Sequence, residues 1–322
     1  MVTTMTFVFC AQDIVSSMTF FLCLSEVHQL QAAVPRVAEP LVREATLQHP
    51  GRCRRLYVFG GTGPPSLNSL DCFDPRIGQW QALPAMRMRC HGHAATLANN
   101  CVYVCGGWGP EPNLRAVERF SLADRQWEAA APMLFPRCDF AVAAVGCQIF
   151  ACGGAGNPRG SSRPLLSVER LDTALGHWEV APSMSVGRAG LAAASLRGQV
   201  YVCGGIDEHS RPLQLCERFD PEAGRWRASP PMTSARVGLA VASLGGPRGS
   251  ASLYAFGGRV HGRPTGAAER LVLGSRRWEA LPAMAVRRCQ LAAVATAGRL
   301  FALGGCDGSG RGLAAAECFD PA

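Results

Sequence analysis

The sequence predicts an all-β fold: a six-bladed β-propeller with four-stranded antiparallel blades, the first and last of them incomplete in this chain. Two observations predict it. A unit with the same marker residues recurs six times at intervals of 46 to 53 residues, and each unit contains short apolar stretches separated by turn residues. The composition agrees, because 36 glycines and 22 prolines among 322 residues favour short strands joined by turns over long helices.

The repeat carries four markers in register. A glycine pair ends an apolar stretch, and an aromatic residue stands three positions before it. A tryptophan follows 20 to 25 residues after the first glycine, with an acidic residue nine positions before the tryptophan. All six units have the pair and the aromatic, and the first five also have the tryptophan. The pairs are Gly60–Gly61, Gly106–Gly107, Gly153–Gly154, Gly204–Gly205, Gly257–Gly258 and Gly304–Gly305; the tryptophans are Trp80, Trp127, Trp178, Trp226 and Trp278.

Each marker has a physical role in a four-stranded unit. In the third unit, "FAVAAVGC", "QIFACGG", "LLSVERLD" and "GHWEVAP" read as four strands with Gly, Pro and Asp turns between them. The glycine pair suits a strand end where a side chain would crowd its neighbour. The acid lies within an apolar strand, so we expect it to accept backbone hydrogen bonds or to pair with arginine. A single unit cannot bury both faces, so the units must stack radially into a propeller.

These markers are the signature of the kelch repeat, which the sequence resembles over residues 54–322. Just before the first repeat, "PLVREATLQHP" (residues 40–50) could form a short helix and resembles the end of the BACK region of Kelch-like (BTB–BACK–kelch) proteins. The chain therefore resembles the propeller portion of that family, without the BTB domain and most of BACK.

The resemblance divides the chain into three parts. Residues 1–39 are expected to be weakly structured or isoform-specific, and 40–53 a BACK-like helical remnant or linker. Residues 54–322 are the kelch propeller, with units near 54–85, 86–133, 134–184, 185–232, 233–284 and 285–322.

The ends of the predicted ring do not match the other units. Glu317 predicts a tryptophan four positions beyond the last residue, and the unit that begins near Arg54 lacks a recognisable first strand. The strand-like "TFVFC" and "MTFFLCL" near the N-terminus could substitute, although neither carries the motif. We favour a truncated or alternatively spliced product, whose open strand edges would invite aggregation.

Composition also narrows the class of protein. The 15 cysteines are odd in number and lie within apolar runs, so most should be reduced thiols in a cytoplasmic protein. No stretch is long enough for a membrane span, and no basic region precedes the apolar N-terminus, so we expect neither a membrane anchor nor a signal peptide. The formal charge is +8, and every basic residue is arginine. These arginines are dispersed through the repeats, which favours acidic protein partners over nucleic acid.

No enzyme is predicted, and no metal or other cofactor. Some kelch propellers are copper oxidases, but all four tyrosines stand at the structural position of the repeat. Only His91 and His93 lie close together, on one face of a strand, and such a pair more often packs or faces solvent than binds metal. Cys101 and Cys105 share a strand face without nearby ligands. No nucleophile, base and acid grouping stands out.

The predicted binding site lies on the loops that follow the glycine pairs and on those that join successive blades, since loops at one mouth of the ring carry function in the family. Each inter-blade loop has an arginine four residues after a methionine, or three residues after it in the first loop. These five arginines could form a ring that binds carboxylates. The alternative is that each packs its stem between blades and caps carbonyls. They are Arg89, Arg137, Arg188, Arg236 and Arg288.

Other candidates lie outside the repeat pattern. Five loop arginines are better placed to give specificity, the alternative being ordinary solvated charge: Arg159, Arg163, Arg211, Arg259 and Arg263. Trp108 follows a glycine pair and is either an exposed interface anchor or folded back over the neighbouring blade.

The resemblance implies a protein-interaction module: the substrate-recognition part of a cullin-RING ubiquitin ligase adaptor, which binds a protein substrate, an acidic peptide being the expected kind. The family docks the cullin through BTB, so the ligase link would require a BTB domain absent here. The alternative is an actin-binding or other cytoskeletal scaffold without a ligase role, in which case the protein would be cytoskeleton-associated.

Overall fold

The computed structural model describes residues 4–9, 18–21, 56–61, 67–74, 79–109, 115–156, 163–245, 251–296, 298–313 and 316–321. In these ranges the chain is all-β: strands β1 to β26 are joined by turns and loops, and no helix occurs. None of the described segments is therefore a helix that could cross a membrane. The predicted fold class is confirmed as an all-β propeller with four-stranded antiparallel blades.

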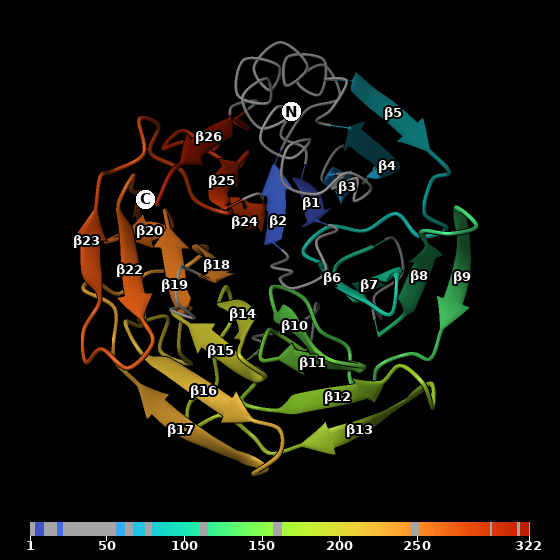
Figure 1. Ribbon diagram of the computed structural model, residues 1–322, viewed down its shortest axis with the longest axis horizontal. Helices are drawn as coiled ribbons and strands as arrows, with labels where there is room; N and C mark the ends of the chain where they lie inside the picture. The colour runs from blue at the N-terminus through green and yellow to red at the C-terminus, as the bar shows by residue number, and fades with distance from the viewer. Residues whose placement is uncertain are drawn as a thin grey trace.

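Four sheets repeat one pattern, in which four strands pair antiparallel in chain order, from the centre of the ring to its outer edge (Figure 1). We number these blades 2 to 5 by position in the chain. Blade 2 contains β6 (Ala94–Ala98), β7 (Cys101–Cys105), β8 (Val117–Ser121) and β9 (Gln126–Ala130). Blade 3 contains β10 (Ala141–Val145), β11 (Gln148–Cys152), β12 (Val168–Asp172) and β13 (His177–Ala181). Blade 4 contains β14 (Ala192–Leu196), β15 (Gln199–Cys203), β16 (Cys216–Asp220) and β17 (Arg225–Ser229). Blade 5 contains β18 (Ala240–Gly245), β19 (Ala251–Phe256), β22 (Ala268–Val272) and β23 (Glu279–Leu281). In its loop lies a hairpin of β20 (Arg259–Val260) and β21 (Arg263–Pro264).

Blade 1 has five strands, and two of them come from the N-terminal segment. Its order is β2-β1-β3-β4-β5, where β1 (Thr4–Phe9) and β2 (Met18–Phe21) precede β3 (Leu56–Gly61), β4 (Leu67–Asp74) and β5 (Gln79–Leu83). β1 pairs antiparallel with β3, with Val8 opposite Tyr57. The expectation of an incomplete first blade is therefore wrong, because the strand-like N-terminal stretch supplies the missing inner strand. Part of the 1–39 segment is strand, and the predicted 40–53 helix lies outside the described residues.

The last unit forms a terminal sheet of three strands. They are β24 (Ala292–Thr296), β25 (Arg299–Leu303) and β26 (Ala316–Phe319), paired antiparallel in chain order. The described residues thus form five blades of four or five strands and one sheet of three, arranged around a common centre (Figure 1).

The repeated tryptophans tie each blade to the one before it. Their indole N–H groups donate to a main-chain carbonyl in the segment that ends the preceding blade, which satisfies the polar atom of a large apolar side chain. The four bonds are Trp127 to Pro84 (2.7 Å), Trp178 to Ala131 (2.8 Å), Trp226 to Pro182 (2.7 Å) and Trp278 to Pro230 (2.9 Å).

The glycine pairs are required where the chain leaves the second strand. Gly154 has φ +92°, and a Cβ there would lie 2.5 Å from the Phe140 Cβ and 2.6 Å from the Cys138 carbonyl oxygen. A side chain at this position would be strained and would collide with the linker segment that leads into β10 of the same blade. Both the backbone conformation and the close packing therefore explain why a glycine pair ends the second strand.

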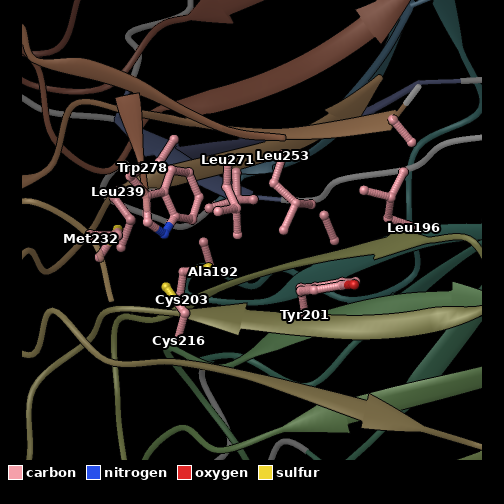
Figure 2. Close-up of a cluster of buried hydrophobic side chains, with 14 residues drawn as sticks. Ala192, Leu196, Tyr201, Cys203, Cys216, Met232, Leu239, Leu253, Leu271 and Trp278 are labelled. Atoms are coloured by element: carbon pink, nitrogen blue, oxygen red, sulfur yellow. The ribbon is translucent and has the colours of Figure 1, made fainter. Parts of the chain in front are cut away.

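The core consists of apolar layers between neighbouring blades. Figure 2 shows one, in which Tyr201 and Cys203 of blade 4 face Leu253 and Leu271 of blade 5, with Trp278 at one end. Because each layer needs side chains from two blades, burial of the apolar surface depends on blades stacking side by side.

Candidate partner-binding rim

The inter-blade linkers and the loops after the glycine pairs meet at one end of the ring. Main-chain hydrogen bonds join them, for example from Met184 to the Leu166 carbonyl (3.0 Å) and from Arg188 to the Leu165 carbonyl (3.1 Å). We call this end the rim. It comprises residues 84–93, 131–140, 182–191, 230–239 and 282–291 of the linkers, and 108–109, 115–116, 155–156, 163–167, 206–215, 259–267 and 306–313 of the loops.

Four of the five recurrent arginines lie inside the blades, which corrects their assignment to partner binding. Arg137, Arg188, Arg236 and Arg288 are at most 1% exposed and are among the largest fully buried side chains. The predicted ring of guanidinium groups exists, but it faces the interior. The alternative function of these residues, capping carbonyls between strands, is the one that the structure shows.

Each buried guanidinium is held by a carboxylate and by main-chain carbonyls. Arg137 donates to Glu169 (2.9 Å) and to the carbonyls of Gly153 (2.8 Å) and Ser167 (2.9 Å). The equivalent ion pairs join Arg188 to Glu217, Arg236 to Glu269 (2.6 Å) and Arg288 to Glu317 (2.7 Å). Burial lowers the pKa of Arg188, Arg236 and Arg288, while the paired carboxylates oppose that shift. The repeated acid therefore serves as the arginine's buried partner.

Blade 2 departs from this pattern, because Cys90 stands where the other linkers have the arginine. Cys90 is fully buried, and burial and the nearby Glu118 charge raise the pKa of its thiol to about 12. The Glu118 carboxylate accepts the main-chain N–H of Arg87 (3.0 Å), and burial raises its pKa. The predicted rim residue of this linker, Arg89, is exposed, one position earlier in the chain.

A ring of backbone hydrogen bonds runs from blade to blade along the linkers. Asp139 donates to Gly92 (3.0 Å), Gly190 to Asp139 (2.7 Å), Gly238 to Gly190 (2.8 Å) and Gln290 to Gly238 (2.7 Å). All five residues have a positive φ, which explains the three glycines. This ring was not predicted from the sequence. A usable signal was present, because Gly190 and Gly238 each stand two positions after the buried arginine of their linker.

Trp108 is folded back against the protein. It is half-buried, packs on the core of blades 1 and 2, and stacks on His91 with ring planes 12° apart. The two residues also form a main-chain pair, with the His91 N–H 2.9 Å from the Trp108 carbonyl. The indole hydrogen-bonds to the Asp139 carboxylate of the next blade. These contacts match the alternative in which Trp108 folds back over the neighbouring blade. An interface role for the exposed part of the Trp108 side chain stays a prediction.

The arginines outside the repeat pattern occupy different environments. Arg163 (side chain 85% exposed) lies 3.6 Å from Glu208, and Arg211 lies 2.7 Å from Asp207. Arg263 is exposed, whereas Arg259 is half-buried with its Nε 3.2 Å from the Cys289 sulfur. Arg159 lies outside the described residues. Arg163, Arg211 and Arg263 thus present charge at the rim, and their role in specificity stays a prediction.

An apolar group on the rim was not predicted. Leu134 (40% exposed), Phe135 (51%) and Leu166 (50%) lie on two adjoining stretches. The buried Glu169 accepts the main-chain N–H groups of Leu134 (2.6 Å) and Phe135 (3.2 Å), and Arg137 donates to Ser167 in the other stretch. The buried ion pair therefore holds this exposed apolar group in place. Its sequence signal was "MLFP", the linker with large apolar residues directly after the methionine.

Exposed charge on the rim is mainly positive. The exposed arginines outnumber the exposed carboxylates, Asp139 and Glu208; they are Arg87, Arg89, Arg115, Arg163, Arg211, Arg263, Arg287 and Arg311. A net positive surface beside an apolar group attracts segments that combine acidic and apolar side chains.

The two neighbouring histidines of the sequence do not share a metal-like environment. His93 is fully buried, and burial lowers its pKa to about 3. His91 stacks on Trp108. Within the described ranges, no group of three or more His, Cys, Asp or Glu side chains is arranged to hold a metal ion.

The blades and their loops define a repeat-built propeller with a rim of loops at one end, and comparison with known proteins identifies the repeat. The KLHDC2/KLHL20/DRC7 Kelch-repeats domain matches residues 19–205, and the Kelch motif matches 187–233 and 287–322. The chain belongs to the Kelch-repeat family.

Curated relatives and a solved structure agree with this assignment. The chain is 37% identical over 131 residues to human Kelch-like protein 33 (40% of this chain, 24% of that protein). It is 28% identical over 173 residues to human Kelch repeat and BTB domain-containing protein 12 (47% and 28%). The chain thus spans about a quarter of these relatives. The solved structure of YjhT matches with a TM-score of 0.70 at 13% identity, covering 83% of this chain and 91% of that one, which shows the fold alone.

Proposed function

We propose that this protein is a non-enzymatic interaction module that binds an acidic segment of a protein partner through the rim. The observation that carries the proposal is the apolar group Leu134, Phe135 and Leu166 on a rim whose exposed charge is mainly arginine. Apolar side chains contribute burial energy, and arginine forks bind carboxylates with directional hydrogen bonds.

We further propose that the module serves as the substrate-recognition part of a cullin-RING ubiquitin ligase adaptor in the cytoplasm. Support comes from the similarity to Kelch-like proteins and to a protein named for both its kelch repeats and its BTB domain. We infer that the terminal sheet is the sixth blade of the ring, since it repeats the inner strand order of the others.

The binding proposal is tested by selecting peptides from a displayed library on the purified chain. Binding of the selected peptides is then measured with two rim variants, Phe135→Ser and Arg163→Glu. Matched controls at the opposite end of the ring are Leu175→Ser (73% exposed) and Arg276→Glu, which change similar side chains away from the rim. Enriched acidic peptides should bind at least about tenfold more weakly to the rim variants and unchanged to the controls.

Two outcomes would contradict the binding proposal: peptides without acidic residues, or equal binding by rim and control variants. The ligase role is tested separately by co-purifying the protein from cells and probing for a cullin. Co-sedimentation with filamentous actin in place of a cullin would favour the cytoskeletal alternative.

A further inference from the structure

Two cysteine sulfurs lie in contact at the rim of the terminal sheet. Cys289, in the linker after blade 5, and Cys306, directly after the last glycine pair, form a cross-strand pair through two main-chain hydrogen bonds (3.1 and 2.9 Å). Their Sγ atoms are 3.3 Å apart. Both residues are free thiols, at most 2% exposed.

A cation from the neighbouring blade contacts this pair. Arg259, in the loop of blade 5, places its guanidinium Nε 3.2 Å from the Cys289 Sγ. Hydrogen bonds from the Cys306 thiol and then from Arg259 lower the pKa of Cys289 to about 7, although burial opposes the shift. The same contact with Cys289, together with burial, raises the pKa of Cys306. Near neutral pH, a substantial fraction of Cys289 is therefore thiolate, whereas Cys306 stays a thiol.

We propose that Cys289 and Cys306 form an oxidation site at which a hydroperoxide converts the two thiols to a disulfide. The Cys289 thiolate attacks one peroxide oxygen and breaks the O–O bond, which gives a sulfenic acid and, after protonation, water. Cys306 then attacks the Cys289 sulfur, the S–O bond breaks, and a second water leaves. The two cysteines lose two electrons and two protons, and hydrogen peroxide is reduced to two waters.

The backbone geometry suits this product. Residues in a hydrogen-bonded antiparallel pair have Cα atoms about 5.5 Å apart, within the range of about 4.4–6.8 Å that disulfides span. The sulfurs must approach from 3.3 Å to about 2.05 Å, a change that side-chain rotation can supply.

Access to the sulfurs depends on two partly exposed side chains. Arg259 contacts Cys289, and the Gln290 amide oxygen lies 3.4 Å from the Cys306 Sγ. Because both side chains reach solvent, their rotation admits a small oxidant without opening a blade.

Oxidation also changes the rim. A disulfide carries no negative charge, so Arg259 loses its thiolate partner and can turn to an acidic ligand. This consequence rests on the proposed function, whereas the oxidation site itself does not.

The chain provides a matched control at the same position of another blade. Cys138, like Cys289, follows a buried arginine, but its cross-strand neighbour is Ala155. Burial and the nearby Asp139 charge raise the pKa of Cys138. Cys138 should therefore remain a thiol under conditions that oxidise Cys289.

The test uses the reduced full chain, treated with equimolar hydrogen peroxide at pH 7, quenched with catalase, denatured and alkylated. Trypsin cleaves after Arg288, Arg299 and Arg311, so residues 289–299 and 300–311 form two peptides with one cysteine each. Non-reducing mass spectrometry should show these peptides joined. The linked product should be absent in Cys289→Ser and unchanged in Cys138→Ser.

A second variant separates the chemistry from folding. Arg259→Gln keeps both sulfurs and should form the disulfide roughly threefold more slowly at pH 7, because a smaller fraction of Cys289 is thiolate. The loss is only partial, since a thiolate of higher pKa is a stronger nucleophile. Its thermal transition shows whether the fold is intact. Absence of linked peptides from folded wild type would overturn the site, and an unchanged rate in Arg259→Gln would overturn the role of Arg259. No partner is involved in this reaction, so either failure leaves the proposed function untouched. If the site holds, the release of Arg259 is tested by peptide binding before and after oxidation. Binding should become stronger in wild type and stay unchanged in Cys289→Ser.

Discussion

The guanidinium of Arg137 donates through Nε to the Glu169 carboxylate at 2.9 Å, with both side chains fully buried. The same carboxylate accepts the N–H groups of Leu134 and Phe135, whose side chains point to solvent. One buried ion pair therefore connects the interior of blade 3 with the apolar group on the rim.

Replacement of this arginine should destabilise the protein strongly. Arg137→Met leaves the Glu169 carboxylate buried without its cation, which should lower the free energy of unfolding by about 3–5 kcal/mol. Urea denaturation measures the change, with Arg163→Met as the exposed control, expected within about 0.5 kcal/mol of wild type. Equal stabilities of the two variants would show that the pair contributes nothing.

The carboxylates of blades 2 and 3 should respond differently to neutralisation. Glu169→Gln removes the charge that pairs with Arg137 and should cost about 3–5 kcal/mol. Glu118→Gln removes a charge that burial disfavours, where Cys90 stands in place of arginine, so its cost at pH 7 should stay below about 1 kcal/mol. Urea denaturation of both variants at pH 7 compares the two costs, and equal losses would contradict the difference between the blades.

The effect of Glu118→Gln should also depend on pH. Because the folded-state pKa of Glu118 is raised above 4.5, wild type is most stable, relative to the variant, below that value. It loses that relative stability as pH rises through the folded-state pKa. Denaturation curves for both proteins between pH 4.5 and 7 measure this, and a difference that does not vary with pH would contradict the raised pKa.

Two glycines with similar backbone conformations should differ in their tolerance of alanine. At Gly176 (φ +73°) an added Cβ would have nothing within 4 Å, so Gly176→Ala should cost about 1–2 kcal/mol for its left-handed backbone alone. Gly154→Ala adds a collision with Phe140 and Cys138 and should cost about 1–3 kcal/mol more. Thermal unfolding of both variants compares the two costs; equal losses would show that close packing at the glycine pair is unimportant.

Removal of the N-terminal strands should impair folding of the ring. Deletion of residues 1–21 takes away β1 and β2 and leaves the β3 edge unpaired. Exposed strand edges promote association, so the truncated protein should elute as soluble aggregate and lose its sharp thermal transition. A monomer with the wild-type transition would indicate that β1 is dispensable. Size-exclusion chromatography with thermal unfolding distinguishes the two results.

The sequence predicted the blades well because their causes are local and repeated. The glycine pairs, the tryptophans and the alternating strands recur at fixed spacing, and each is required by backbone conformation or by packing against the neighbouring repeat. Whether the recurrent arginines point into the blades or out to solvent was not predictable from such local repeats. Arg137 and Glu169 are 32 residues apart, and only strand pairing brings them together.

The sequence by itself determined the repeat, the all-β class, the positions of the four strands and the loops that form the rim, because periodic burial specifies each unit. The tertiary structure alone decided which charges are buried, that β1 joins blade 1, and that Cys289 meets Cys306 beside Arg259. The physical reason is that contacts between segments distant in sequence depend on how the blades close around the ring, and no local pattern encodes that closure.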